Sequence, residues 1–189
     1  MALFRKAPPQ DPLIVAMSGA RLGQRMLVVP GTDLQALVDV AARVGLTGRA
    51  LALVADPVAR QRVQDRATQG GVLVDVEALT VPFPLPDAGF DIAIVDDRAA
   101  RAGTHSTDTL LPELARVLRP AGRLLVLVPA PSSPLAGLFG SEPAAPDVSG
   151  LLGALGRGGF TAARLLGVRQ GTAFVEAVRR PFESFELFE

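Results

Sequence analysis

The stretch that decides the fold reads PFPLPDAGFDIAIVDD at residues 82–97 and LRPAGRLLVLV at residues 118–128. Phe90–Val95 is a short apolar segment after a proline-rich turn, which is typical of a buried strand. The turn at residues 119–122 leads into a second apolar strand over residues 123–128. Two such strands with a helix between them predict a parallel sheet joined by right-handed crossovers.

The connecting helix is expected over residues 108–118, with Asp108 placed to cap it. Pro112 then falls in the first turn of that helix, where a missing backbone N–H costs little because those donors have no helical partner.

The same alternation of strand and helix fills the chain before this stretch. Thr32 stands three residues before Gln35, a capping-box spacing that predicts the start of a helix ending at Gly45. The other predicted elements are a helix over 12–19, a strand over 26–29, a strand over 50–55, a helix over 57–68 and a strand over 72–76.

After residue 129 the sequence predicts a long loop or lid over residues 130–147, rich in Pro, Ala, Ser and Gly. Its apolar side chains Leu135, Leu138 and Phe139 either cover a ligand or only pin the loop to its own domain. A helix over 149–156 and a hairpin of strands at 160–168 and 172–178 complete the chain. We therefore expect a flexible tail at 1–11, one domain at 12–180, and a second tail at 181–189.

Composition excludes several classes of protein. The chain has 189 residues, 19 basic and 19 acidic, and its basic residues form no cluster on one predicted face, so a nucleic-acid partner is not expected. It has no cysteine, which excludes disulfides and thiolate nucleophiles. No apolar run approaches the roughly 20 residues of a membrane span, and no signal-peptide core is present. A cytoplasmic location is the simplest expectation.

Six landmarks in order along residues 11–179 resemble the type 11 branch of class I S-adenosylmethionine-dependent methyltransferases. They are Gly23–Leu27, Gly48–Pro57, Asp75–Leu79, Pro82–Asp91, Leu114–Leu118 and Pro120–Val126. The resemblance implies a Rossmann-like, doubly wound α/β fold with a seven-stranded, mostly parallel sheet and a C-terminal antiparallel hairpin. It also implies S-adenosylmethionine as cofactor and methyl transfer to a small molecule.

The cofactor residues that the resemblance implies are Gly31 in the turn after the first strand, and Asp75 and Val76 on the adenine side. In this family an acidic residue at the end of the second strand binds the ribose hydroxyls, and Val54 stands at that position. Asp56 is a substitute only if the strand ends two residues later, and its other interpretation is an ordinary turn residue before a proline.

The turn after the first strand departs further from the family pattern. Only Gly31 of the glycine-rich turn remains, Pro30 removes a backbone donor, and Asp33 places negative charge near the expected cofactor carboxylate. Thr32 is also expected to cap the following helix. These departures leave two hypotheses open, a methyltransferase with a reduced cofactor pocket and a non-catalytic relative that acts as a scaffold or interaction subunit.

Asp96 and Asp97 are weak candidates for acid–base catalysis, because they follow the fourth strand at the edge where open α/β folds bind ligands. Glu77 is a weaker candidate on the same edge. His105, the single histidine, lies in a polar loop and is expected to be exposed to solvent. No metal site is expected.

The end of the chain, FESFELFE at residues 182–189, carries Phe182, Phe185 and Phe188 between acidic residues. Aromatic anchors of this kind dominate many interfaces, which predicts a protein partner bound through these three side chains. The alternative is that the tail packs on its own domain or frays.

Overall fold

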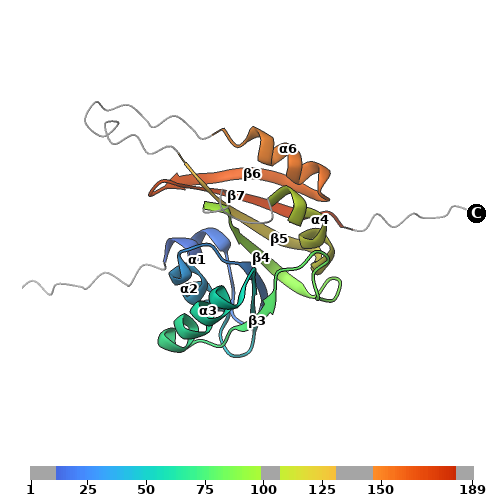
Figure 1. Cartoon of the computed structure of the whole chain (residues 1–189). Coiled ribbons are helices and arrows are strands. Elements are labelled where there is room, and N and C mark those ends of the chain that lie inside the picture. The colour runs from blue at the N-terminus through green and yellow to red at the C-terminus, as the bar shows by residue number, and fades with distance from the viewer. Residues whose placement is uncertain (1–11, 99–106, 131–146, 182–189) are drawn as a thin grey trace, which may run out of the picture.

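The computed structural model describes residues 12–98, 107–130 and 147–181 (Figure 1). Its strands are β1 (Arg25–Val29), β2 (Arg49–Val54), β3 (Asp75–Ala78), β4 (Phe90–Asp96), β5 (Leu118–Pro129), β6 (Phe160–Arg169) and β7 (Thr172–Arg179). Its helices are α1 (Leu13–Ser18), α2 (Leu34–Val44), α3 (Pro57–Gly70), α4 (Thr107–Val117) and α6 (Ser149–Arg157). The expected tails and the lid at 130–147 lie almost wholly outside the described residues.

All seven strands form one sheet in the order β3-β2-β1-β4-β5-β7-β6. The first five run parallel, whereas β7 is antiparallel to both β5 and β6. This confirms the predicted seven-stranded, mostly parallel sheet with a C-terminal hairpin. From β1 the chain winds outward to β3, and then it returns to the centre at β4 and winds the other way. The point of reversal therefore lies between β1 and β4.

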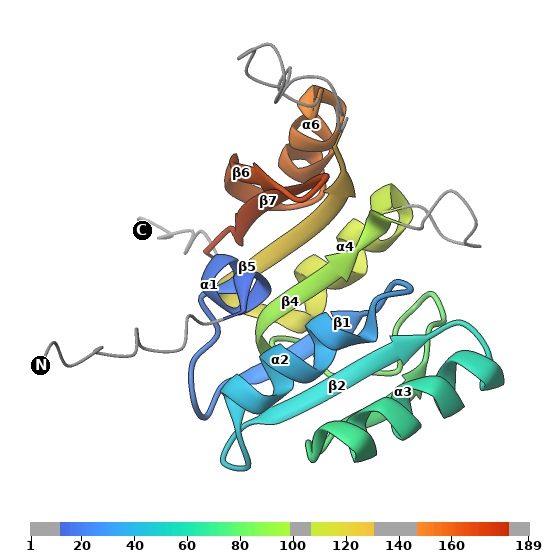
Figure 2. The same ribbon diagram turned by 90° about the vertical axis from the view of Figure 1, so that its left-hand side faces the viewer.

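Helices cover both faces of the sheet, as Figure 2 shows from the side. Because side chains of a strand alternate between faces, each central strand contributes to two apolar cores. Met26 and Val28 of β1 pack with α1, α2 and α3, whereas Leu27 packs on the opposite face with α4 and α6. This two-sided burial explains why the strands are apolar at nearly every position.

The connection between β3 and β4 contains no helix and instead places one aromatic side chain in the core. Phe83, which is 3% exposed, packs on the α4 face beside Phe90. Its backbone is held by α4: the Phe83 N–H donates to Glu113 Oε2 at 2.7 Å, and its carbonyl accepts from Arg116 Nη2 at 3.0 Å. The proline-rich turn noted in the sequence is therefore a loop anchored to α4.

The two outermost strands are irregular or short. β3 has four residues, and β6 shifts its register against β7 twice, between Thr161 and Arg164 and between Leu165 and Gly167. Ala162 within the first shift has φ 51°, a left-handed conformation that is unusual for a residue with a side chain.

Four local expectations were wrong. Residues 119–122, expected as a turn, lie within β5, which starts at Leu118 and shifts its register against β4 there. The third strand is β3 at residues 75–78 rather than 72–76, because Val72 still belongs to the turn that closes α3 and donates to Ala67 O. Asp33, rather than Thr32, caps α2 by accepting from Gln35 N at 3.0 Å. Asp108 lies inside the first turn of α4, so Pro112 is the sixth residue of that helix and not part of its first turn.

No helix in the described ranges combines the length and the apolar character needed to cross a membrane.

Candidate functional site

The carboxyl ends of β1 and β4 lie side by side, with Val29 paired to Val95. Open α/β sheets bind ligands at such a reversal of winding, because the loops leaving the two strands diverge and open a crevice. The loop after β1 carries Gly31 and Asp33, and the segment after β4 carries Asp97 and Arg98. The structure therefore brings four residues of the two loops to one edge, together with Asp96 at the end of β4.

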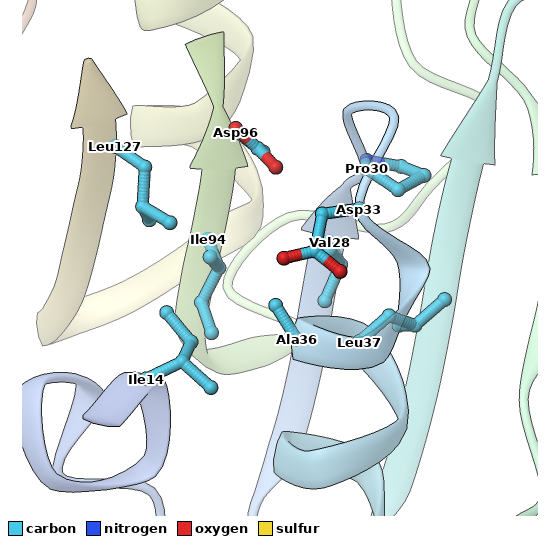
Figure 3. A pocket seen from close by; sticks show the side chains of 9 residues that line it. All are labelled: Ile14, Val28, Pro30, Asp33, Ala36, Leu37, Ile94, Asp96 and Leu127. Carbon is cyan, nitrogen blue, oxygen red and sulfur yellow. The ribbon is translucent and has the colours of Figure 1, made fainter. Parts of the chain in front are cut away.

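Three charged side chains fill the crevice. Arg98 donates from Nε to Asp96 Oδ1 at 2.8 Å and from Nη2 to Asp96 Oδ2 at 2.7 Å, which is a bidentate pair. The same Nη2 lies 3.5 Å from Asp33 Oδ2 across the gap between the two loops. Figure 3 shows the carboxylates of Asp33 and Asp96 at the mouth between the strand ends. The Asp96 side chain is only 7% exposed, and the guanidinium of Arg98 balances its charge.

Gly31 packs directly against Asp96. A Cβ atom added to Gly31 would lie 2.7 Å from both Cγ and Oδ2 of Asp96, a distance that forces one of them to move. A side chain at position 31 would therefore displace the Asp96 carboxylate, so the close neighbour of this turn is a carboxylate of the same chain. The space beside the Gly31 backbone is already occupied.

Below this charged layer lies a small apolar pocket lined by Ile14, Val28, Ile94 and Leu127. Its volume is about 10 Å³, which is room for roughly one water molecule. A larger, polar pocket of about 190 Å³ adjoins it between α1, α2 and the β6–β7 turn. Arg98 and Asp33 line that pocket on one side and Arg169 on the other, so the accessible volume lies beside the crevice rather than within it.

The end of β2 offers no ribose acceptor. Val54 is the last residue of β2, and its side chain is buried in the core on the α1–α3 face. Asp56 caps α3, since its Oδ1 accepts from Ala59 N at 2.8 Å. β2 thus ends at Val54, two residues before Asp56, and Asp56 caps α3.

The adenine-side residues lie on β3. Asp75 is the first residue of that strand and pairs with Arg49 Nε at 2.7 Å, near the amino ends of β2 and β3. Val76 is buried, and its carbonyl accepts from Arg60 Nη1 at 2.5 Å. Both residues were expected at the end of the third strand, and the shift of β3 moves them toward its start. Glu77 is exposed on the same strand.

Asp97 follows Asp96 on the other face of β4, beside Thr107 and Asp108 of α4, and it has no cationic partner in the described structure. Burial raises its pKa above the ordinary value of 3.8, and Asp96 and Asp108 add to the rise while the Thr107 hydroxyl opposes it. A carboxylate whose pKa is raised is a stronger base. Of the two acid–base candidates, Asp96 is paired with Arg98, whereas Asp97 has no cationic partner among the described residues.

Arg98 is the residue of this site that the sequence analysis missed, because the arginines are scattered along the chain and none stood out. The signal was the run Asp96-Asp97-Arg98 directly after a buried strand. His105 lies outside the described residues. Within the described ranges no three histidine or acidic side chains are arranged to hold a metal ion.

The Gly31 turn lies at the edge where open α/β sheets bind ligands. Two features oppose the binding of S-adenosylmethionine there: the Asp96 carboxylate lies against Gly31, and Val54 cannot accept a hydrogen bond from a ribose hydroxyl.

No protein-family model matches the chain. In sequence it is similar to the ubiquinone/menaquinone biosynthesis C-methyltransferase UbiE of Ectopseudomonas mendocina (strain ymp), with 38% identity over 127 residues. The match covers 64% of this chain and 48% of that enzyme, so the chain spans about half the length of this relative.

Solved structures share its fold. A SAM-dependent methyltransferase from Aquifex aeolicus superposes with a TM-score of 0.69 over 87% of each chain at 19% identity. The [4+2]-cyclase SpnF superposes with a TM-score of 0.66 over 89% of this chain and 80% of its own, at 18% identity. By its sheet order and its sequence similarity, the chain is a methyltransferase-like protein related to the class I S-adenosylmethionine-dependent methyltransferases.

Proposed function

We propose that this protein binds S-adenosylmethionine at the carboxyl edge of β1 and β4, with reduced affinity, and transfers its methyl group to a small molecule. The proposal is supported by the strand order β3-β2-β1-β4-β5-β7-β6, whose reversal of winding lies between β1 and β4, where the loop with Gly31 begins. The similarity to a C-methyltransferase supports the same activity.

Little catalytic chemistry is required of the protein for such a transfer beyond holding the reactants in line. Asp97 is the residue proposed to accept the proton that a nucleophilic acceptor loses, because its carboxylate is half-buried and has a raised pKa. The pocket of about 190 Å³ beside the crevice is the proposed place of the acceptor. Binding of the cofactor requires that Asp96 leave the space beside Gly31, which breaks its ion pair with Arg98.

A second function is favoured by one specific observation. The crevice is filled by an ion pair of the protein's own side chains, and the ribose acceptor is replaced by a valine. A non-catalytic relative that serves as a scaffold or interaction subunit would keep the apolar strands for stability and have no need of these cofactor contacts.

Calorimetric titration with S-adenosylmethionine and S-adenosylhomocysteine separates the two functions. Binding in the micromolar range supports the enzyme, whereas no heat up to millimolar ligand removes it and leaves the scaffold. The titration is repeated with Arg98→Ala, which removes the guanidinium from the crevice. Tighter binding by this variant is expected if the ion pair is what lowers affinity, and unchanged binding would contradict that explanation.

Val54→Asp is a sharper test of the ribose position. A charged acceptor for two hydroxyls is worth roughly 2 to 4 kcal/mol, so we expect this variant to bind either ligand roughly 10 to 1,000 times more tightly. Val54→Asn is the matched control, because it supplies a neutral acceptor of similar size and should improve affinity less. Thermal melts check that both variants fold. Equal affinities for all three proteins would show that Val54 does not face the ribose.

A further inference from the structure

The described surface has a groove along α4, which extends from Asp108 in the first turn of the helix to Arg116 in the last. One hollow, of about 780 Å³, lies between Pro112 and Ala115 of α4 and the end of β7 at Arg180 and Pro181. A second, of about 270 Å³, lies between α4 and α6 and is also lined by Pro112. The shared proline joins the two hollows into one groove, which we call the α4 groove.

The floor of the α4 groove is backbone. Gly158 and Gly159 pass close to the helix: a Cβ added to Gly158 would lie 2.8 Å from Leu111 Cβ, and one added to Gly159 would lie 3.4 Å from Ala115 Cβ. Because neither glycine carries a side chain and Ala115 and Pro112 are small, the groove stays open. Its floor is apolar where α4 contributes to it.

The rim of the groove is positively charged. Arg157 is exposed on the last turn of α6, and Arg180 is exposed after β7, where its Nη2 donates to Gly156 O at 2.8 Å. Neither has an acidic partner among the described residues. The one acidic side chain lining the groove is Asp108, at its far end. The rim therefore attracts an acidic segment, and the floor accepts apolar side chains.

A segment that is both acidic and aromatic follows the groove directly in the sequence. Pro181 lines the first hollow, and residues 182–189 follow it directly with the sequence FESFELFE. Eight extended residues span up to about 26 Å. The 11 residues of α4 span about 16 Å, so this segment is long enough to reach both hollows.

We propose that residues 182–189 fold back into the α4 groove of their own chain. Phenylalanine side chains, each three residues from the next, contact Pro112, Ala115 and the glycine floor, and the glutamates pair with Arg157 and Arg180. Apolar contact fixes the segment to the helix, and the charges set its direction along the groove. This docking does not involve Gly31, Asp96 or Arg98, because none of them lines the α4 groove.

A single fluorescent reporter tests the proposal, because the chain contains no tryptophan and no tyrosine. In the full-length Phe185→Trp variant, docking predicts emission at shorter wavelength, and weaker quenching by acrylamide, than in a synthetic peptide of residues 182–189 carrying the same substitution. Emission and quenching equal to those of the peptide would overturn the proposal.

Charge reversal locates the docking site. Adding Arg157→Glu and Arg180→Glu should return the emission of the reporter to that of the peptide. Arg62→Glu on the exposed face of α3 is the matched control and should leave the emission unchanged. Ala115→Glu, which places bulk and negative charge on the floor, should act like the double reversal. Circular dichroism verifies the fold of each variant. If the reporter at position 185 remained shielded from acrylamide in both the double reversal and the Ala115→Glu variant, the tail would lie elsewhere and the proposal would be overturned.

Dilution distinguishes docking within one chain from exchange between two copies. The proposal requires emission that does not change with protein concentration and a monomer in size-exclusion chromatography of the same samples. Protection that appears only at high concentration together with a dimer would make a second copy the occupant and overturn docking within the chain.

Discussion

Asp96 and Asp97 are neighbours in the chain, yet their carboxylates have opposite effects on stability. Asp96 is almost fully buried but makes a bidentate pair with Arg98. Asp97 is half-buried, has no cation beside it among the described residues, and lies near two other carboxylates. A buried charge with a partner stabilises the fold only while the partner is present, whereas a buried charge without one is a direct cost.

We therefore predict that Asp97→Asn increases the free energy of unfolding at pH 7. Burial raises the pKa of Asp97, so the folded state binds this proton more tightly than the unfolded chain does, and ionisation destabilises the fold. The gain should vanish below pH 3.8, the ordinary value for this group, because both states are then protonated. Urea denaturation at pH 3.5 and pH 7 measures the difference.

Asp96→Asn is the matched comparison and should have the opposite sign at pH 7, because it leaves the Arg98 guanidinium without its charged partner. If both substitutions lowered the free energy of unfolding at pH 7, the assignment of Asp97 as an unpaired buried charge would be wrong.

The sequence predicts which loops lie side by side, but it does not predict which of their side-chain atoms are in contact. Gly31, Asp96 and Asp97 could be assigned to one edge because parallel strands place their carboxyl ends together. The contact of Arg98 with Asp33 could not, since it joins residues 65 positions apart through side-chain conformations that no local pattern encodes. The close approach of the Asp96 carboxylate to Gly31 could not be predicted either, because it also depends on a side-chain conformation.

The helix α4 covers one face of the sheet and also anchors the loop between β3 and β4. Glu113 accepts from the Phe83 N–H at 2.7 Å and from Arg116 Nη2 at 2.7 Å, and Arg116 also donates to Leu85 O at 2.8 Å. This network holds Phe83 in the core where the chain forms no helix.

We predict that Glu113→Ala lowers the free energy of unfolding by about 1 to 3 kcal/mol, because it leaves a buried donor and part of a guanidinium unpaired. Arg116 holds the pKa of Glu113 below its ordinary value of 4.5, so this contribution is present above that pH and is lost as the pH falls through the lowered pKa. Urea denaturation at pH 7 and at acidic pH measures both effects.

Asp87→Ala is the control for Glu113→Ala, because Asp87 pairs with the same arginine at 2.6 Å but its side chain is 75% exposed. Exposed pairs contribute about 0 to 1 kcal/mol. An equal loss for the two variants would show that the anchoring network contributes no more than a surface ion pair.

Element types were predictable from the sequence, and some boundaries were not. The apolar segments and the glycine or proline residues that bound them identified all seven strands. The start of β3 was misplaced because Val72 and Val74 are apolar residues that pack against the core from the turn before the strand. The cap of α2 was assigned to Thr32 because Thr32 and Gln35 have the spacing of a capping box, whereas α2 begins one residue later and is capped by Asp33.

At the scale of the whole molecule, the two wings of the sheet join through β1 and β4, which are far apart in sequence. Asp91 strengthens this joint at the amino ends of the strands. Its Oδ2 accepts from the Arg25 N–H of β1 at 2.7 Å, and its Oδ1 pairs with Arg119 Nε of β5 at 2.5 Å. One carboxylate on β4 thus binds both neighbouring strands.

We predict that Asp91→Ala lowers the free energy of unfolding by about 1 to 3 kcal/mol and speeds hydrogen exchange at the Arg25 amide, because that donor loses its charged acceptor. Asp75→Ala is the matched control, since the Arg49–Asp75 pair is also a 2.7 Å contact but lies half-exposed at the rim of the sheet. Denaturation and exchange data that do not separate the two variants would refute a special role for Asp91.

The edge strands β3 and β6 determine whether copies of this protein can associate through their sheets. An apolar sheet with a straight free edge is a template onto which a foreign strand can add and start aggregation. Here one margin is only four residues long, and the other is broken by two register shifts and carries arginines. Neither presents a continuous row of donors and acceptors, so the described sheet resists growth from both sides.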